Sequence, residues 1–193
     1  MKAKKKCLIL KANLTQKETH KVSMADGSSI DIFIARKYNE NDREASPNIC
    51  NVVSVGDGIP DISEGDNIIV HHNTVKNDAC HIEKKDGYVY LSIPYDNLIY
   101  AKISDDGELT PVGNSIIAER IECKKLSQFD YTERTEPMKF KVVSVPSHYT
   151  EVKPNQNILC YKMSDYEIVY HHKDSEHRAI RILQEDILGV FAE

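Results

Sequence analysis

An internal repeat is the feature that most constrains how this chain of 193 residues folds. Three segments of the first half recur in the second half in the same order, two at an offset of 90 residues and one at 89. The pairs are 52–55 (VVSV) with 142–145 (VVSV), 67–69 (NII) with 157–159 (NIL), and 96–99 (DNLI) with 185–188 (EDIL). Self-similarity at a nearly constant offset indicates tandem copies of one structural unit. The sequence therefore predicts two domains, 1–106 and 107–193, which meet near 104–113.

The pattern of apolar residues predicts short β-strands and no helix. Ten apolar or β-branched segments lie between turn sequences: 8–10, 30–34, 52–55, 67–70, 88–93, 116–117, 140–145, 158–161, 168–170 and 180–183. The segment 88–93 (YVYLSI) alternates with a period of about two, as half-buried strands do. No stretch of a dozen residues shows an apolar period of 3.6. Many short strands at this spacing predict an all-β chain of small barrels or sandwiches.

Composition and charge restrict the partners of the chain. It is 40% hydrophobic and 28% charged, which is typical of a globular protein. The net charge of -5 provides no basic field that would attract nucleic acid. No apolar run is long enough to cross a membrane, and Lys11 ends the apolar stretch 7–10 too early for a signal peptide. The five cysteines form no C-x-x-C pair, which favours reduced thiols. We expect a cytoplasmic protein without nucleic-acid or membrane partners.

The first copy contains an insertion that the second copy lacks. Between its opening strand and its VVSV strand it is longer by about 18 residues, within 23–47, and insertions of this kind are usually functional loops or disordered segments. Its only apolar cluster consists of Ile30, Ile32, Phe33 and Ile34. A second interpretation is a β-hairpin that turns at Asp26-Gly27. In that case Ile32 and Ile34 are core residues of an added strand.

The motifs around the repeated strand resemble those of the GroES-type co-chaperonins, the ten-kilodalton chaperonin family. The residues that carry the resemblance are 52–58 (VVSVGDG), 64–70 (EGDNIIV), 111–120 (PVGNSIIAER) and 182–190 (ILQEDILGV). The resemblance covers nearly the whole chain, twice. It implies an all-β fold of two tandem GroES-like, partly open Greek-key β-barrels. It also implies a homo-oligomeric ring that caps the folding chamber of a chaperonin ring of the GroEL type.

In the resembled family, a mobile loop before the V-V-A-V-G strand docks on the chaperonin through a glycine followed by three aliphatic residues. The insertion at about 23–47 falls at this place, so the resemblance makes Ile30, Ile32, Phe33 and Ile34 the expected partner-binding residues. The chain departs from the family because no glycine directly precedes three aliphatic residues, and because 58–64 and 147–154 are too short for the family's roof hairpin. These departures favour an alternative function. A bacteriophage capsid or virion-assembly protein would use the barrels as a scaffold for other virion proteins.

No pattern of catalytic or metal-binding residues stands out. The motifs G-x-S-x-G, G-x-G-x-x-G and H-E-x-x-H and the P-loop are missing from the sequence. The histidines and one cysteine that invite a metal interpretation match no standard zinc spacing: His71, His72, Cys80, His81, His171, His172 and His177. We interpret them as solvent-facing residues near strand ends, with adjacent histidines on opposite faces of a strand. The sequence therefore predicts a protein that is not an enzyme and has no cofactor and no metal.

Overall fold

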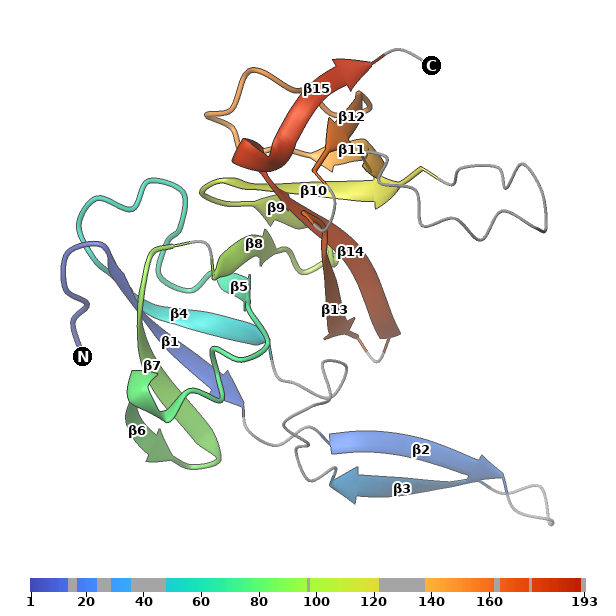
Figure 1. Cartoon of the computed structure of the whole chain (residues 1–193). Helices are drawn as coiled ribbons and strands as arrows, with labels where there is room; N and C mark the ends of the chain where they lie inside the picture. Colours follow the sequence, from blue (N-terminus) through green and yellow to red (C-terminus); the bar gives the residue numbers. More distant parts are fainter. Residues whose placement is uncertain are drawn as a thin grey trace. The chain divides into compact units, whose positions relative to one another are not determined.

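The computed structural model describes residues 1–13, 17–23, 29–35, 48–96, 98–121, 138–161, 164–173 and 175–191. Over these ranges the chain is all-β, with fifteen strands and two short 3-10 segments, η1 (Asp78–Cys80) and η2 (Gln184–Asp186) (Figure 1). Contacts divide the chain into two compact units, Met1–Tyr95 and Asp96–Glu193. No helix in the described ranges is long and apolar enough to cross a membrane.

Unit 1 is built around a sheet of antiparallel strands. Its strands are β1 (Cys7–Asn13), β2 (Lys17–Ser23), β3 (Ser29–Ala35), β4 (Ile49–Val55), β5 (Asn67–Val70), β6 (His81–Lys85) and β7 (Tyr88–Pro94). Five of them lie in the order β6-β7-β1-β4-β5, whereas β2 and β3 form a separate two-stranded sheet. The opening strand β1 is therefore central and pairs with β4 on one side and β7 on the other.

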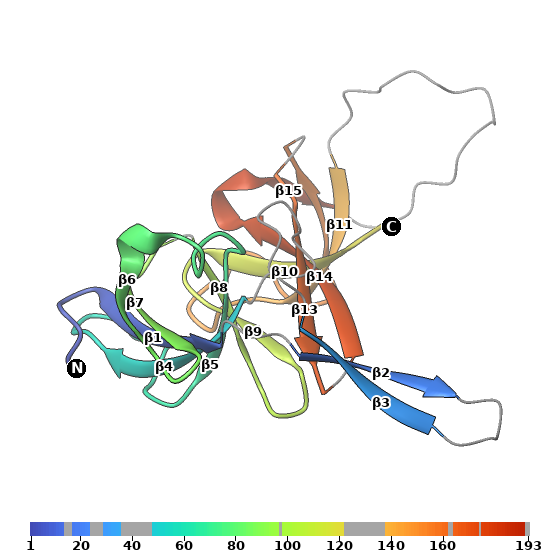
Figure 2. The same ribbon diagram turned by 90° about the horizontal axis from the view of Figure 1, so that it is seen from below.

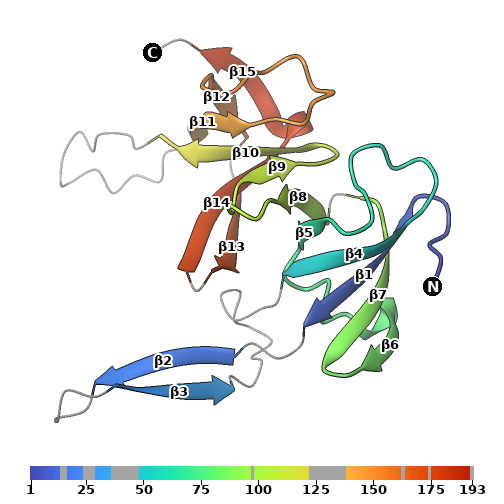
Figure 3. The same cartoon turned by 180° about the vertical axis from the view of Figure 1, so that it is seen from behind.

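Unit 2 repeats this arrangement (Figure 3). Its strands are β8 (Ile99–Ile103), β9 (Leu109–Pro111), β10 (Ser115–Arg120), β11 (Met138–Ser144), β12 (Asn157–Cys160), β13 (Tyr166–His172), β14 (Ser175–Leu183) and β15 (Ile187–Phe191). β8 and β9 pair with each other, and the other six lie in the order β13-β14-β10-β11-β12-β15. The order is like that of a Greek key, since β14 returns to lie beside β10. Among the described residues, the sheet ends in two edge strands, β13 and β15, and does not close into a barrel.

The two units share a β-bulge at corresponding positions. In unit 1 the register of β1 with β4 shifts between Ile9 and Leu10. In unit 2 the register of β10 with β11 shifts between Ile117 and Ala118. The partners of Leu10 and Ala118 are Val52 and Val142, which are 90 residues apart. Because a bulge inserts one unpaired residue and bends the strand, its recurrence means that both units bend at the same point.

The turn before β5 in unit 1 and the turn before β12 in unit 2 also have the same geometry. The amide of Gly65 donates to the carbonyl oxygen of Val52 at 2.8 Å, and that of Asn155 donates to Val142 at 2.8 Å. Both turn residues have left-handed backbone angles, with φ of 91° at Gly65 and 68° at Asn155. Glycine and asparagine are the residues that tolerate this conformation best. The substitution of one for the other therefore preserves the turn.

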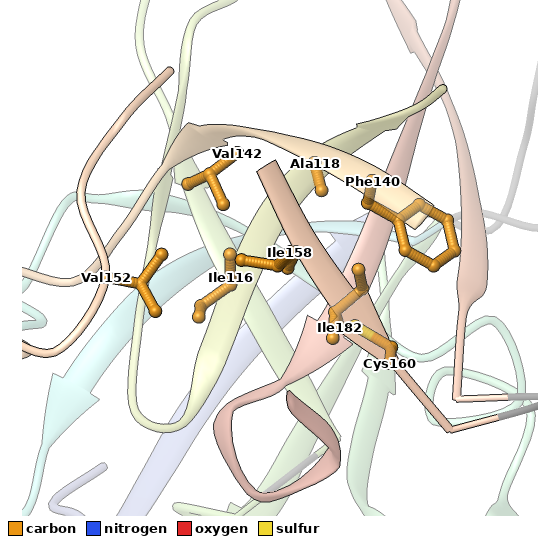
Figure 4. Packing of buried hydrophobic residues seen from close by; sticks show 8 residues of the cluster. All are labelled: Ile116, Ala118, Phe140, Val142, Val152, Ile158, Cys160 and Ile182. Carbon is orange, nitrogen blue, oxygen red and sulfur yellow. The ribbon is translucent and has the colours of Figure 1, made fainter. Parts of the chain in front are cut away.

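The core of unit 2 is a cluster of eight buried residues on one face of its sheet (Figure 4). Its members are Ile116, Ala118, Phe140, Val142, Val152, Ile158, Cys160 and Ile182. The repeat aligns these with eight residues of unit 1 that are at most 4% exposed: Leu8, Leu10, Cys50, Val52, Ile62, Ile68, Val70 and Ile93. Where unit 2 has Ala118 and Phe140, unit 1 has Leu10 and Cys50. Ala118 is smaller than Leu10, and Phe140 is larger than Cys50. The two differences offset each other, so the total side-chain volume at these positions is similar in both units.

The structure confirms the all-β prediction. Each of the ten predicted segments overlaps a strand, and the structure adds β2, β6, β8, β9 and β15. These five were missed because they are polar, short or weakly alternating. The boundary between the compact units lies at 95/96. The boundary between the sequence repeats, near 104–113, lies later and includes β8 in the first copy.

Candidate functional site

The first candidate site is the β2–β3 ribbon, which lies between β1 and β4 in the chain (Figure 2). The two strands are antiparallel, and their pairs run from Lys17 with Ala35 to Ser23 with Ser29. This pairing corresponds to the hairpin interpretation of the insertion. Residues 24–28, which include the expected turn at Asp26-Gly27, lie outside the described residues, as do 36–47.

All four predicted partner-binding residues lie in β3. The register pairs Ile30 with Val22, Ile32 with His20, Phe33 with Thr19 and Ile34 with Glu18. Successive residues of a strand belong to opposite faces, so Ile30, Ile32 and Ile34 share one face of the ribbon and Phe33 belongs to the other. The structure describes the backbone of this ribbon, and its side chains lie outside the description. A partner that contacts all four residues would have to reach both faces.

The first histidine pair lies at the end of a strand, as expected, but just outside it. β5 ends at Val70, and His71 and His72 follow it in a turn. Their rings stack with centroids 4.2 Å apart and an interplanar angle of 29°. The alternation of faces that holds within a strand does not apply to this pair, because both histidines follow the last residue of β5.

Another histidine of unit 1, His81, has a structural role at the start of β6. His81 Nδ1 lies 2.9 Å from Asp78 Oδ1, and its Nε2 lies 2.8 Å from the carbonyl oxygen of Val75. Lys84 Nζ lies 3.1 Å from the same Asp78 oxygen. The hydrogen bond and charge of Lys84, with the charge of His81, lower the pKa of Asp78. These contacts hold η1 against β6, and in the described ranges no three His, Cys, Asp or Glu residues are arranged to hold a metal ion.

In unit 2 the β13–β14 hairpin carries an aromatic cluster that packs on the β8–β9 turn. The rings of Tyr170 and His177 stack at 5.3 Å, and His172 Nε2 lies 3.0 Å from the carbonyl oxygen of Asp105. The hydroxyl of Tyr170 donates to the carbonyl oxygen of Gly107 at 3.3 Å. Burial raises the pKa of Tyr170, so this donor stays protonated. Gly107 has φ of 87°, and a Cβ there would lie 3.0 Å from the His172 ring. The cluster fixes the turn.

The second candidate site is an open groove of about 650 Å³ in unit 2. It lies beside the aromatic cluster and is lined by the β8–β9 turn and by parts of β9, β10, β11, β13 and β14. Polar and ionisable residues line it together with aliphatic ones. Its size is that of a cleft which takes a small ligand or a short stretch of a partner chain.

Sequence reasoning missed this groove. Its residues come from five strands, and none of them forms a recognisable motif. One signal was available: Glu119 occupies the position at which the first copy has Lys11. A reversal of charge between two copies gives the corresponding faces different electrostatic potentials.

In comparisons with known proteins, no family model matches the chain and no curated protein matches it.

Proposed function

We propose that the chain is a co-chaperonin-like protein, which binds a chaperonin ring of the GroEL type through the β2–β3 ribbon and caps its folding chamber as a homo-oligomer. One observation carries the proposal. The ribbon is inserted between β1 and β4 of a unit whose β-bulge, turn and core positions recur in unit 2. The resembled family has its chaperonin-binding loop at this place.

The physical chemistry of a cap fits one short ribbon per chain. A ribbon with few apolar residues gives weak binding, and weak binding allows release at the end of each folding cycle. Several ribbons in a ring bind together, since each attachment raises the effective concentration of the next. The proposed function needs no catalytic residue and no cofactor, and it belongs in the cytoplasm.

The antiparallel pairing of β2 and β3 favours a second function. An ordered ribbon is what a scaffold protein would present to its neighbours, and the chain lacks the glycine before three aliphatic residues that the family uses. In this alternative the chain is a bacteriophage capsid or virion-assembly protein. Its partners are other virion proteins.

The test is the binding of the purified full chain to a chaperonin ring from its own host, with and without nucleotide. Ile32→Ser/Phe33→Ser/Ile34→Ser removes apolar surface from both faces of the ribbon. It is expected to abolish nucleotide-dependent binding.

The matched control is Ile82→Ser/Leu98→Ser, which replaces two aliphatic side chains that are 49% and 42% exposed outside the ribbon. It is expected to bind like the original chain. If the original chain does not bind the ring, the co-chaperonin proposal fails and the scaffold function takes its place. If the control and the ribbon variant lose binding equally, the ribbon is not the site.

A further inference from the structure

The groove of unit 2 is lined in part by residues of the sheet face opposite to the core. In β10, Ile116 and Ala118 belong to the core cluster, so Ile117 and Glu119 point to the other face. Ile117 is only 4% exposed, because this face is covered near β9. Ile117 and Glu119 both line the groove, together with Ala118 and Ile180 at the edge of the core.

The groove has an exposed aliphatic wall. Val143 lines it and is the residue of β11 that the bulge leaves without a partner in β10. Its side chain is 45% exposed, whereas the neighbouring Val142 is completely buried. Leu109 of β9 also lines the groove. An aliphatic group of a partner can therefore be removed from water against Val143, and such burial is favourable in proportion to the apolar area.

The arginines that line the groove form ion pairs, whereas two of its glutamates form none with the residues that the structure describes. Arg120 is paired with Asp165, and Arg178 is paired with Glu167 at 3.4 Å, so both arginines have acidic partners. Glu108 and Glu119 also line the groove, and within the described ranges neither carboxylate has an ion-pair partner. In this part of the chain, as described, the groove thus offers two carboxylates that form no ion pair, with Lys141 opposite Glu119 in the register of β10 and β11, whereas both arginines that line it are paired.

Unit 1 shows that this charge pattern is not a general property of the fold. The repeat aligns Glu119 with Lys11, and Lys11 Nζ lies 3.9 Å from the centre of the Tyr88 ring. A cation over an aromatic ring occupies the corresponding face of unit 1. The acidic, open face is therefore particular to unit 2.

We propose that this groove binds an extended segment of a partner protein in which lysine or arginine alternates with an aliphatic residue. The cation pairs with Glu108 and Glu119, and the aliphatic side chain packs against Val143. Charge complementarity selects a basic segment, and alternation places its apolar side chains on one face as in a strand. The inference concerns unit 2 alone and does not depend on the proposed role of the β2–β3 ribbon.

The test uses the full chain and three synthetic capped hexapeptides, which alternate Lys with Val, Glu with Val, or Lys with Ser. Binding is measured by fluorescence anisotropy, and the site is mapped by amide chemical shifts of the labelled protein. The Lys-Val peptide is expected to bind with a Kd below about 1 mM and to shift amides of β9, β10 and β11. Its affinity should fall as NaCl rises from about 50 to about 300 mM, because exposed charge pairs are screened.

Two variants separate the contributions of charge and apolar contact. Glu108→Gln/Glu119→Gln should weaken the Lys-Val peptide by about three- to ten-fold, since each exposed ion pair contributes little. Val143→Ser should weaken the Lys-Val peptide by about five-fold and leave the Lys-Ser peptide unchanged. The charge-matched control is Glu64→Gln/Glu83→Gln, at two exposed positions of unit 1, and it should bind as the original chain does.

Three results would overturn the proposal. The first is that no Lys-Val binding is detected at millimolar peptide. The second is that the Glu-Val peptide binds equally well. The third is that the groove variant and the control variant behave alike, which would indicate nonspecific attraction to an acidic protein. None of these results depends on a chaperonin, so they are distinct from failure of the proposed function.

Discussion

Two neighbouring valines, Val142 and Val143, allow a sharp test of the register of β11. Val142 is completely buried in the core of unit 2, whereas Val143 is 45% exposed. Val142→Ala removes two methyl groups from the core, which costs about 1.6 kcal/mol of transfer free energy at about 0.8 kcal/mol per group. The cavity left behind adds about 1 kcal/mol. We expect Val142→Ala to lower the free energy of unfolding of unit 2 by about 2.5 kcal/mol, and Val143→Ala to change it by less than about 0.5 kcal/mol.

Urea unfolding followed by far-UV circular dichroism and tyrosine fluorescence measures both values, since the chain has ten tyrosines and no tryptophan. The loss expected for Val142→Ala lowers the midpoint of the transition of unit 2 by about 1–2 M urea. The two variants delete the same atoms from adjacent residues, so each is the other's control. A one-residue slip of β11 would exchange the two results, because it moves every side chain to the other face. Equal losses would refute the bulge that places Val143 outside the core.

Two further predictions concern backbone packing and buried thiols. A Cβ at Gly56 would lie 1.8 Å from the carbonyl oxygen of Lys4, so Gly56→Ala should displace the amino-terminal segment and lower stability by about 1–3 kcal/mol in thermal unfolding. Gly189→Ala, where a Cβ meets nothing within 4 Å, is the control and should unfold at the original temperature. Burial raises the pKa of the Cys50 and Cys160 thiols to about 12. In the unfolded chain both thiols ionise near the ordinary cysteine pKa of 9.0, so their contribution to stability is complete below pH 9 and is lost as pH rises toward 12. Urea titrations between pH 9 and 12 should show that the free energy of unfolding falls less with rising pH in Cys50→Ala than in the original chain. An equal dependence on pH in both proteins would contradict the burial of Cys50.

Much of the fold could be predicted from the sequence because its determinants are local. Alternation in 88–93 corresponds to β7, and the repeated VVSV segments lie in or at the ends of β4 and β11. The polar β2 was not among the predicted strand segments, because nothing in its composition indicates a strand, and only the hairpin interpretation of the insertion implied it. It exists in the structure as the partner of β3.

The candidate sites differ in how far sequence could reach them. Ile30, Ile32, Phe33 and Ile34 were found because they form the apolar part of an insertion that one copy of the repeat lacks. The groove of unit 2 could not be found in this way. Glu108 and Glu119 are far from Val143 in sequence, and they line one groove only because β9 lies near β10 and β11.

The sequence by itself determined that the chain forms two similar β-rich units, because strand periodicity, turn residues and a constant repeat offset are properties of neighbouring residues. Only the tertiary structure decided which strand faces are covered and which stay open. It also showed that Leu10 and Cys50 in unit 1, and Ala118 and Phe140 in unit 2, are all buried. The physical reason is that burial and free volume depend on segments distant in sequence. The same alternation along a strand can therefore place one set of side chains in a core and the next set in an open groove.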